Sequence, residues 1–326
     1  MTTSKTKTIL ITGATAGIGR STALHLARQG HHVIASGRKV VELAKLKTEA
    51  METGLKLDTL VLDVTAITSI AESVSEVNRL TGGHGLDVLV NNAGFGVLGP
   101  TSEITDSETR RQFETNVFGL INVTRAFIPQ MRDRRSGRII NVSSVGGKIT
   151  LPFFGVYNAT KYAVEAMSDA LRYELQPFGI SVVLIEPGVI KTNFEATALA
   201  NTEQFKDSVY GPSMAKQEQM SQIANRFASQ PIAITKAISR AVNARRPWAR
   251  YVAPRFNAMI FWMSAMLPTR VWDWAMRKAG FLGLAAKAAK AAPASKTAAP
   301  LASSASSVGT VTLPKKSAHE VRVASN

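Results

Sequence analysis

The chain has 326 residues, of which 45% are hydrophobic, and it carries a formal net charge of +16 at pH 7. This length and composition are sufficient for a large buried core. The chain contains no cysteine, and its five histidines show no metal-ligand spacing, so disulfide frameworks and thiolate zinc sites are excluded and no structural metal is expected.

Part of the positive charge lies at the C-terminal end. Residues 281–326 carry six lysines or arginines against one glutamate, in a stretch of Ala, Ser, Pro and Lys with too few bulky side chains to fold. Basic clusters also occur at 132–138 and 245–255, but no aromatic and basic nucleic-acid motif accompanies them. We therefore expect no nucleic-acid partner. Solubility, or attraction to an anionic membrane surface, fits the tail better.

The N-terminal segment gives no targeting signal. Residues 1–8 are short and polar and lead directly into an apolar run, which leaves no room for a cleavable signal peptide. No apolar run approaches the roughly 20 residues needed to span a bilayer. We expect a cytoplasmic protein, and peripheral membrane association stays open.

Short apolar and β-branched runs recur along the chain, with helical stretches between them. This alternation predicts a Rossmann-like α/β fold, a doubly wound parallel sheet with helices on both faces. Because the runs are almost continuously apolar, both faces of the sheet should be buried. The predicted strands are Thr8–Ile11, Val33–Ser36, Thr59–Leu62, Val88–Asn91, Arg138–Ser143 and Ser181–Glu186. We expect a single catalytic domain at 1–256, a hydrophobic helical extension at 257–283 and a disordered basic tail at 284–326.

The first predicted strand leads into a glycine-rich turn that opens a helix. Glycines allow the backbone to turn tightly and to approach a pyrophosphate, whose charge is favoured at a helix N-terminus. The turn reads Thr12-Gly13-Ala14-Thr15-Ala16-Gly17-Ile18-Gly19, with three residues between its first two glycines instead of the one in the general dinucleotide motif. With this spacing it resembles the turn of the classical short-chain dehydrogenase/reductase family. The resemblance implies cofactor binding by Gly13, Thr15, Ala16, Gly17, Ile18 and Gly19.

The end of the second strand bears on the choice of cofactor. An acidic residue there would bind the adenosine ribose and repel a 2′-phosphate. Gly37 removes the acid, and Arg38 supplies a multidentate cation suited to phosphate. The sequence therefore favours NADP(H) over NAD(H). Ala16 departs from many NADP-preferring relatives, which carry a second basic residue in the glycine turn.

Further matches to the family follow the third and fourth strands. The resemblance implies that Asp63 and Val64 flank the adenine of the cofactor. It also implies that the Asn-Asn-Ala-Gly turn at 91–94 supports the sheet and lines the cofactor cleft. The residues of that turn expected at the cofactor are Asn92, Ala93 and Gly94.

Ser144 follows the fifth strand, and Tyr157 and Lys161 lie four residues apart on one face of the next helix. Carbonyl reduction needs a proton for the developing alkoxide, but free tyrosine has a pKa near 10 and is a poor base at neutral pH. An ammonium group and a positive nicotinamide ring would together lower the tyrosine pKa by about three units. Ser144 would hydrogen-bond the substrate oxygen.

The family resemblance completes the catalytic set. Asn116, in the helix after the fourth strand, matches the asparagine that supports a water link in a proton relay to Lys161. In the family the lysine also holds the nicotinamide ribose, so Tyr157 and Lys161 are expected at the cofactor as well. The implied catalytic residues are Asn116, Ser144, Tyr157 and Lys161.

The segment after the sixth strand resembles the family's Pro-Gly motif, which approaches the nicotinamide amide. A simple turn at Pro187 and Gly188 is compatible with that role. The residues expected to bind the cofactor here are Pro187, Gly188, Ile190 and Thr192.

The segments expected to face the substrate are 95–98, 151–154 and 194–220, and most of their residues are apolar. An apolar wall suits a ring system or a long chain better than a sugar, although half of such loop residues simply belong to the core. The Met- and Trp-rich segment 258–274 leaves three interpretations open. It would pack on the core, cover a lipid pocket, or dip into a membrane interface.

We interpret the chain as an NADP(H)-dependent oxidoreductase that interconverts an alcohol and a ketone or aldehyde on an apolar steroid-, retinoid- or lipid-like substrate. It resembles hydroxysteroid and retinol dehydrogenases over roughly residues 5–282. The alternative within enzymes is a 3-oxoacyl thioester reductase, against which the long C-terminal extension argues. The alternative of another class is a non-catalytic NADP(H)-sensing protein, which would be expected to lack Tyr157 or Lys161. Because relatives often associate through the helices bearing Asn116 and Tyr157, a homodimer or homotetramer is expected.

Overall fold

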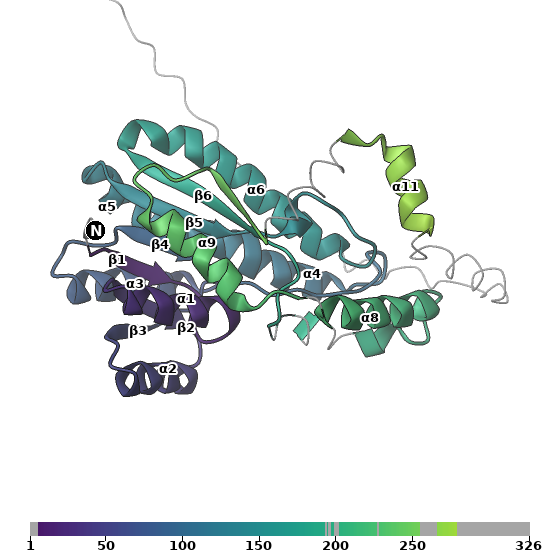
Figure 1. Cartoon of the computed structure of the whole chain (residues 1–326), viewed down its shortest axis with the longest axis horizontal. Helices are drawn as coiled ribbons and strands as arrows, with labels where there is room; N and C mark the ends of the chain where they lie inside the picture. Colours follow the sequence, from purple (N-terminus) through teal and green to yellow (C-terminus); the bar gives the residue numbers. More distant parts are fainter. Residues whose placement is uncertain are drawn as a thin grey trace, which may run out of the picture. The chain divides into compact units, whose positions relative to one another are not determined.

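The computed structural model describes residues 6–192, 194, 197–198, 202–226, 228–254 and 266–278. The chain divides into two units, residues 1–291 and 292–326, and all described residues belong to the first. Within this unit strands and helices alternate, as Figure 1 shows. Counted from the N-terminus, the first elements are β1 (Thr8–Ile11), α1 (Gly17–Arg28), β2 (His32–Gly37), α2 (Val40–Glu52), β3 (Leu57–Val61), α3 (Ile67–Leu80) and β4 (Val88–Asn91).

The remaining elements continue the alternation with short helical insertions. They are α4 (Asp106–Phe113), the π-helix η1 (Glu114–Gly119), α5 (Leu120–Asp133), β5 (Gly137–Val142), the 3₁₀ helix η2 (Val145–Gly147), α6 (Gly155–Leu175), the 3₁₀ helix η3 (Gln176–Phe178), β6 (Ile180–Pro187), the 3₁₀ helix η4 (Thr202–Phe205), α8 (Gly211–Arg226), α9 (Pro231–Asn243), β7 (Arg250–Ala253) and α11 (Thr269–Lys278).

The strands form one parallel sheet in the order β3-β2-β1-β4-β5-β6-β7. The strand order reverses between β1 and β4, and such switch points create the ligand crevice of open α/β sheets. The predicted doubly wound fold is therefore confirmed. The edge strand β7 was not predicted, because three of its four residues are only partly buried and its run is short and mixed in polarity.

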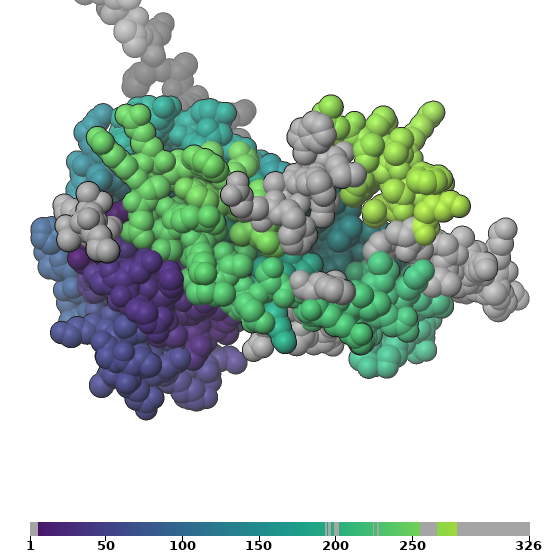
Figure 2. All heavy atoms as spheres, in the orientation of Figure 1, coloured from purple at the N-terminus to yellow at the C-terminus, as the bar shows by residue number. Residues whose placement is uncertain are grey.

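Two apolar layers hold the helices on the sheet. Ile9 and Ile11 of β1 point into the layer with Leu26 of α1 and Ile238 of α9, while Leu10 points into the opposite layer. This alternation follows from the two-residue period of a strand. In Figure 2 the atoms of α9 lie directly against those of α1 on the visible face. Each fully buried aliphatic side chain of this kind contributes about 1.5–3 kcal/mol.

Helix α3 and helix α5 cover the second face, where Val77 and Phe127 are fully buried beside Leu10. Of the predicted extension and tail, residues 257–265 and 279–326 lie outside the described residues. Helix α11, which is described, contains no buried residue. Among the described helices, none has the length and apolar character required to cross a membrane.

Candidate active site

The loops that follow β1, β4, β5 and β6 surround one cavity of about 520 Å³. Ligands of open parallel sheets bind at this carboxyl edge. The predicted residues that line the cavity are Gly13, Ala16, Gly17, Ile18, Asn92, Ala93, Gly94, Ser144, Tyr157, Lys161, Pro187, Gly188, Ile190 and Thr192. The predicted residues outside its wall are Thr15, Gly19, Arg38, Asp63, Val64 and Asn116.

The glycine turn packs too closely against its neighbours to admit side chains. A Cβ on Gly13 would lie 2.9 Å from Ala93 Cα, and one on Gly19 would lie 2.4 Å from the Gly13 carbonyl oxygen. Gly13 also has a φ of +64°, which is strained for other residues. Asn92 Nδ2 donates to the carbonyl oxygens of Thr12 and Gly13 at 2.9 and 3.1 Å. These contacts hold the turn in place with its backbone at the cavity.

The N-terminus of α1 reaches the cavity through Ala16, Gly17 and Ile18. Ala16 gives no side-chain cap, and the first turn of the helix contains no acidic residue. The first backbone N–H groups are therefore available to an anion, and the helix dipole favours negative charge at this end. Together with the absence of Cβ atoms at Gly13 and Gly17, this arrangement fits the pyrophosphate of a dinucleotide.

Arg38 follows β2 and is exposed, and it forms no hydrogen bond or ion pair with another described residue. A Cβ on Gly37 would lie 2.7 Å from Thr15 Cγ2, so any other residue at that position would have to displace the threonine methyl group. Burial acts to raise the pKa of Asp63, but hydrogen bonds from Thr65 and the charge of Arg38 outweigh it and lower that pKa. Arg38 is therefore an exposed cation that is available to a phosphate group.

Val64 and Asp63 differ in their surroundings. Val64 is buried under the π-helix, where a Cβ on Gly119 would lie 2.9 Å from Val64 Cγ2. The Asp63 carboxylate accepts hydrogen bonds from Thr65 N at 2.9 Å and Thr65 Oγ1 at 2.7 Å. The role expected for each at the adenine stays a prediction.

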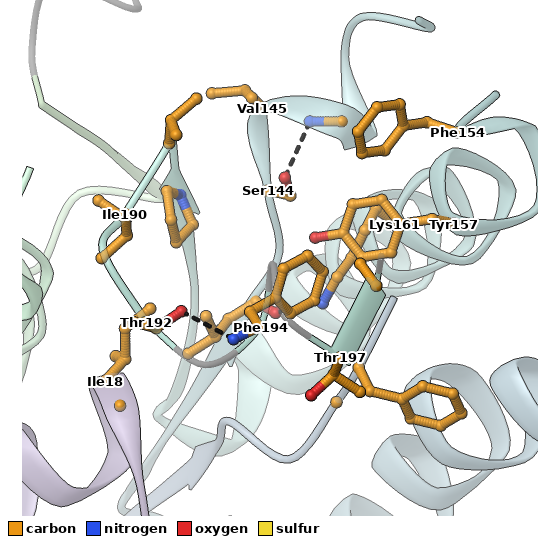
Figure 3. Close-up of a pocket in the computed structure, with 18 of the residues that line it drawn as sticks. Ile18, Ser144, Val145, Phe154, Tyr157, Lys161, Ile190, Thr192, Phe194 and Thr197 are labelled. Carbon is orange, nitrogen blue, oxygen red and sulfur yellow. Dashed lines mark hydrogen bonds between the residues drawn. The ribbon is translucent and has the colours of Figure 1, made fainter. Parts of the chain in front are cut away.

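Ser144, Tyr157 and Lys161 are buried and converge on the cavity from β5 and the start of α6 (Figure 3). The Ser144 hydroxyl accepts a hydrogen bond from Gly146 N at 3.0 Å and is hydrogen-bonded to the Tyr157 side chain. Lys161 Nζ lies 5.8 Å from the centre of the Tyr157 ring and donates to the Val142 carbonyl oxygen at 3.0 Å. The site thus combines a proton donor, its hydroxyl partner and an ammonium group.

Burial shifts the pKa values of Tyr157 and Lys161 in opposite directions. Burial raises the pKa of Tyr157 to about 12, although the Ser144 hydrogen bond acts to lower it. Burial lowers the pKa of Lys161 to about 8, while Glu165 acts to raise it. In the protein alone, the cost of desolvating the phenolate exceeds the effect of the Ser144 hydrogen bond. The lowering expected with the nicotinamide ring bound stays a prediction. At neutral pH Tyr157 is a proton donor.

Asn116 lies in the π-helix η1, a distortion that is often found at functional sites. Its Oδ1 accepts from Phe95 N at 3.0 Å, and its Nδ2 donates to Phe95 O at 2.8 Å and to Thr160 Oγ1 at 3.2 Å. A Cβ on Gly94 would lie 3.1 Å from Asn116 Oδ1 and 3.8 Å from Lys161 Nζ, so Gly94 separates the two side chains. Asn116 therefore holds the cavity wall, and its water link stays a prediction.

The loop after β6 closes the cavity opposite α6. A Cβ on Gly17 would lie 3.4 Å from Thr192 Cβ, so this threonine reaches across to the start of α1. Backbone hydrogen bonds anchor the loop, since Lys191 N donates to Ser229 O at 2.9 Å and Ser229 N donates to Val189 O at 3.1 Å. The predicted Pro-Gly segment is thereby fixed at the cavity.

Two further residues shape the site. Asn158 was missed: its Nδ2 donates to the carbonyl oxygens of Gly146 and Ile149, both at 2.7 Å, and ties the loop after β5 to α6. An asparagine inside a helix is unfavourable, which is the signal that the sequence offered. Phe194, in a segment predicted to face the substrate, places its ring 5.3 Å from that of Tyr157. Figure 3 shows the two rings beside each other at the cavity.

Comparisons with known proteins agree with this geometry. The sequence pattern of the short chain dehydrogenase family matches residues 7–203. The chain is 35% identical to the 3-ketodihydrosphingosine reductase of Bacteroides thetaiotaomicron, over 82% of this chain and 96% of the relative. It is 32% identical to the NADPH-dependent 3-dehydrocapnine reductase of Ornithobacterium rhinotracheale, over 81% of this chain and 94% of the relative.

A solved structure with the same fold also points to this family. The closed form of a serine dehydrogenase complexed with NADP+ superimposes with a TM-score of 0.64 at 29% identity. The match covers 75% of this chain and 93% of the other. Sequence and structure comparisons thus agree on both the fold and a nicotinamide cofactor that carries the 2′-phosphate.

Proposed function

The chain belongs to the short-chain dehydrogenase/reductase family, and we propose that it reduces the ketone of a long, largely apolar substrate with NADPH. The observation that carries this proposal is the convergence of Ser144, Tyr157 and Lys161 on a cavity whose far wall is apolar. That wall contains Leu98, Val145, Leu151, Phe154, Phe194 and Met220.

The enzyme is an oxidoreductase that uses NADP(H). We expect the α1 N-terminus and the glycine turn to hold the pyrophosphate, and Arg38 to bind the 2′-phosphate. We expect Lys161 to hold the nicotinamide ribose, and Ile190 and Thr192 to approach the amide. When bound, NADPH supplies the hydride that reduces the carbonyl carbon.

The chain's own residues supply the proton. The Ser144 hydroxyl would bind the carbonyl oxygen and hold it next to the Tyr157 hydroxyl, which donates its proton as negative charge develops there. Because burial raises the pKa of Tyr157 to about 12, the hydroxyl is protonated at neutral pH and ready to donate. The Lys161 ammonium stabilises the phenolate that remains. A protonated hydroxyl is the state from which reduction starts, and the net direction of the reaction follows the ratio of NADPH to NADP+.

The names of two relatives support a ketone substrate. They are reductases of a 3-keto and a 3-dehydro compound, and such a carbonyl is the group that this site would reduce. The alkyl chain of a sphingoid ketone would fit the apolar wall better than the ring carbons of a sugar would, because burial of its methylenes is favourable by about 0.8 kcal/mol each.

The proposed function is tested with purified full-length protein and a panel of carbonyl compounds. Oxidation of NADPH is followed with 3-ketodihydrosphingosine, steroid and retinoid carbonyls, a 3-oxoacyl thioester and a keto sugar. We expect the highest kcat/KM with an apolar ketone. A higher value for the 3-oxoacyl thioester would replace the proposed substrate class, and NADPH binding without turnover on any compound would favour a sensing protein.

We expect Arg38→Asp to weaken NADPH binding by about 10- to 100-fold, because a charge-assisted contact to the 2′-phosphate is worth about 1.5–3 kcal/mol. The variant should leave NADH binding nearly unchanged, since NADH lacks that phosphate. Both affinities are measured by nucleotide fluorescence. Lys39→Asp, at the next exposed position, changes the charge equally and should spare NADPH. Equal losses for both nucleotides in Arg38→Asp would remove this assignment.

Two finer expectations belong to this proposal. Exposed aromatic side chains on η1 and α6, at Phe118, Tyr162 and Tyr173, support association of two or more copies through these helices. Exposed Trp274 on α11, next to Arg277 and Lys278, supports peripheral contact with an anionic membrane surface. Membrane contact would bring the enzyme to an apolar substrate without changing its chemistry.

A further inference from the structure

Helix α8 lines part of the cavity with a face that is partly polar. Its residues in the cavity wall are Gln217, Met220 and Ser221. Ser213 is buried as well, so Ser213, Gln217 and Ser221 follow one another at intervals of four residues on one face of the helix. A helix that only packed on a core would carry apolar side chains along this face. Packing alone therefore does not account for these polar side chains.

The side-chain amide of Gln217 is buried at the cavity without a partner for its oxygen. Gln217 is 6% exposed, and its Oε1 receives no hydrogen bond from any described residue. Glutamine is mostly exposed in folded proteins. A buried polar atom without a partner costs free energy, and in native proteins such an atom usually meets a water molecule or a ligand. Because Gln217 belongs to the cavity wall, a bound molecule can supply the missing partner.

Two other residues of the wall also have a buried oxygen without a partner among the described residues, but they belong to the catalytic end of the cavity. They are Ser143 and Asn158, which adjoin Ser144 and Tyr157 in the sequence. Gln217 comes instead from α8, which carries none of the catalytic residues. Its amide therefore meets a part of the substrate other than the reacting carbonyl, which Ser144 and Tyr157 would bind.

Packing of buried side chains fixes α8 on the loops that line the substrate side. Met214 of α8 packs with Phe153 and Phe205 in one buried cluster. A Cβ on Gly99 would lie 2.5 Å from Phe205 Cε2, and Gly99 N donates to Phe153 O at 2.9 Å. Phe153 keeps a φ of +67°, which is unfavourable for a residue with a bulky side chain. Because Met214 stands three residues before Gln217 on the same helix, this cluster fixes where the amide lies.

We propose that Gln217 determines specificity by hydrogen-bonding a hydroxyl group of the apolar substrate, away from the ketone that is reduced. The inference rests on the proposed function, because it concerns the substrate of the same site. An amide both accepts and donates hydrogen bonds, and a hydroxyl group matches it because it does the same. An ammonium group would lose more hydration in an apolar cavity than one amide oxygen restores. The substrate class is thus a hydroxylated long-chain ketone.

The first test uses long-chain ketones that carry one hydroxyl group at successive carbons from the carbonyl. Each is compared with its methyl ether and its amino analogue by kcat/KM with NADPH. We expect one hydroxyl position to exceed its ether by about 10-fold, because an ether cannot donate to Gln217 Oε1. Equal values for every hydroxy ketone and its ether would overturn the proposal. A higher value for an amino ketone would overturn the hydroxyl as the recognised group.

Gln217→Met keeps the length of the side chain and removes the amide. It should lower kcat/KM for the preferred hydroxy ketone by about 10-fold. It should raise kcat/KM for the unsubstituted ketone, because methionine presents no unpaired oxygen to an alkyl chain. Gln219→Met, at an exposed position of α8, is the matched control and should leave both values unchanged. The proposal fails if Gln217→Met keeps the wild-type ratio of the two values, or if Gln219→Met changes that ratio equally.

Thermal unfolding without ligand separates a binding role of the amide from a structural one. Because Gln217 Oε1 has no partner among the described residues, Gln217→Met should raise the melting temperature by a few degrees. Gln219→Met should leave the melting temperature unchanged, since that side chain is exposed. A lower melting temperature in Gln217→Met, together with the wild-type substrate preference, would assign the amide a structural role and overturn the proposal.

Binding measurements separate this inference from the proposed function. Calorimetry gives the Kd of each hydroxy ketone and its ether for the protein with NADP+, which cannot reduce a ketone. Tighter binding of one hydroxy ketone, lost in Gln217→Met, would retain the contact even in a protein that reduces no carbonyl compound, and would then refute the reductase function alone. Reduction of apolar ketones with the same preference in the wild type and in Gln217→Met would retain the function and refute the contact.

Discussion

Replacing Tyr157 by phenylalanine should lower kcat for ketone reduction by about 10²–10⁴-fold, the range expected when a general acid is removed. The phenylalanine ring keeps the contact with Phe194 and loses only the hydroxyl that is hydrogen-bonded to Ser144. Because that hydroxyl is the proton donor and contributes little to the pyrophosphate or ribose contacts, the Kd for NADPH should stay within about threefold, less than 1 kcal/mol. Steady-state kinetics and nucleotide fluorescence measure the two quantities.

Tyr162→Phe is the matched control for this prediction. Tyr162 lies on the same helix, next to Lys161, but its side chain is exposed and faces away from the cavity wall. This variant should retain wild-type kcat. Undiminished turnover in Tyr157→Phe would show that another group donates the proton and would defeat the mechanism.

Gly19→Ala should lower the free energy of unfolding by about 3 kcal/mol and the melting temperature by roughly 10 °C. The added Cβ would lie 2.4 Å from the Gly13 carbonyl oxygen and 2.5 Å from Asn92 Nδ2. The Gly13 carbonyl oxygen belongs to the backbone, so this clash can be relieved only if the glycine turn moves. The hydrogen bonds from Asn92 to that turn would also be lost, at about 1 kcal/mol each. Calorimetry measures the change.

A glycine in open space provides the comparison. Gly54 has a φ of +70° and nothing within 4 Å of its Cβ position, so Gly54→Ala should cost only the strain of a left-handed residue, about 1–2 kcal/mol. NADPH binding should survive in Gly54→Ala and be strongly weakened in Gly19→Ala. If the two variants lose equal stability and both keep NADPH affinity, the close packing of the glycine turn is not what stabilises the site.

The sequence by itself determined the fold class and most of the cavity. Continuous apolar runs separated by helical stretches predict a covered parallel sheet, because both patterns depend on local periodicity. The glycine turn and the Tyr157–Lys161 spacing are likewise local, since both lie within one turn or one helix. The carboxyl ends of parallel strands must meet at one edge, which brought distant motifs such as Ser144 and Pro187 together.

Only the tertiary structure decided the features that depend on burial and on distant partners. Gly37 packs closely against Thr15, and β7 is recognisable as a strand only through its pairing with β6. Arg250 meets Glu165 across 85 residues of sequence. Desolvation, which no local pattern reports, raises the pKa of both Tyr157 and Glu186. A sequence records which groups are present, but their charge states depend on how much water the folded chain removes from around them.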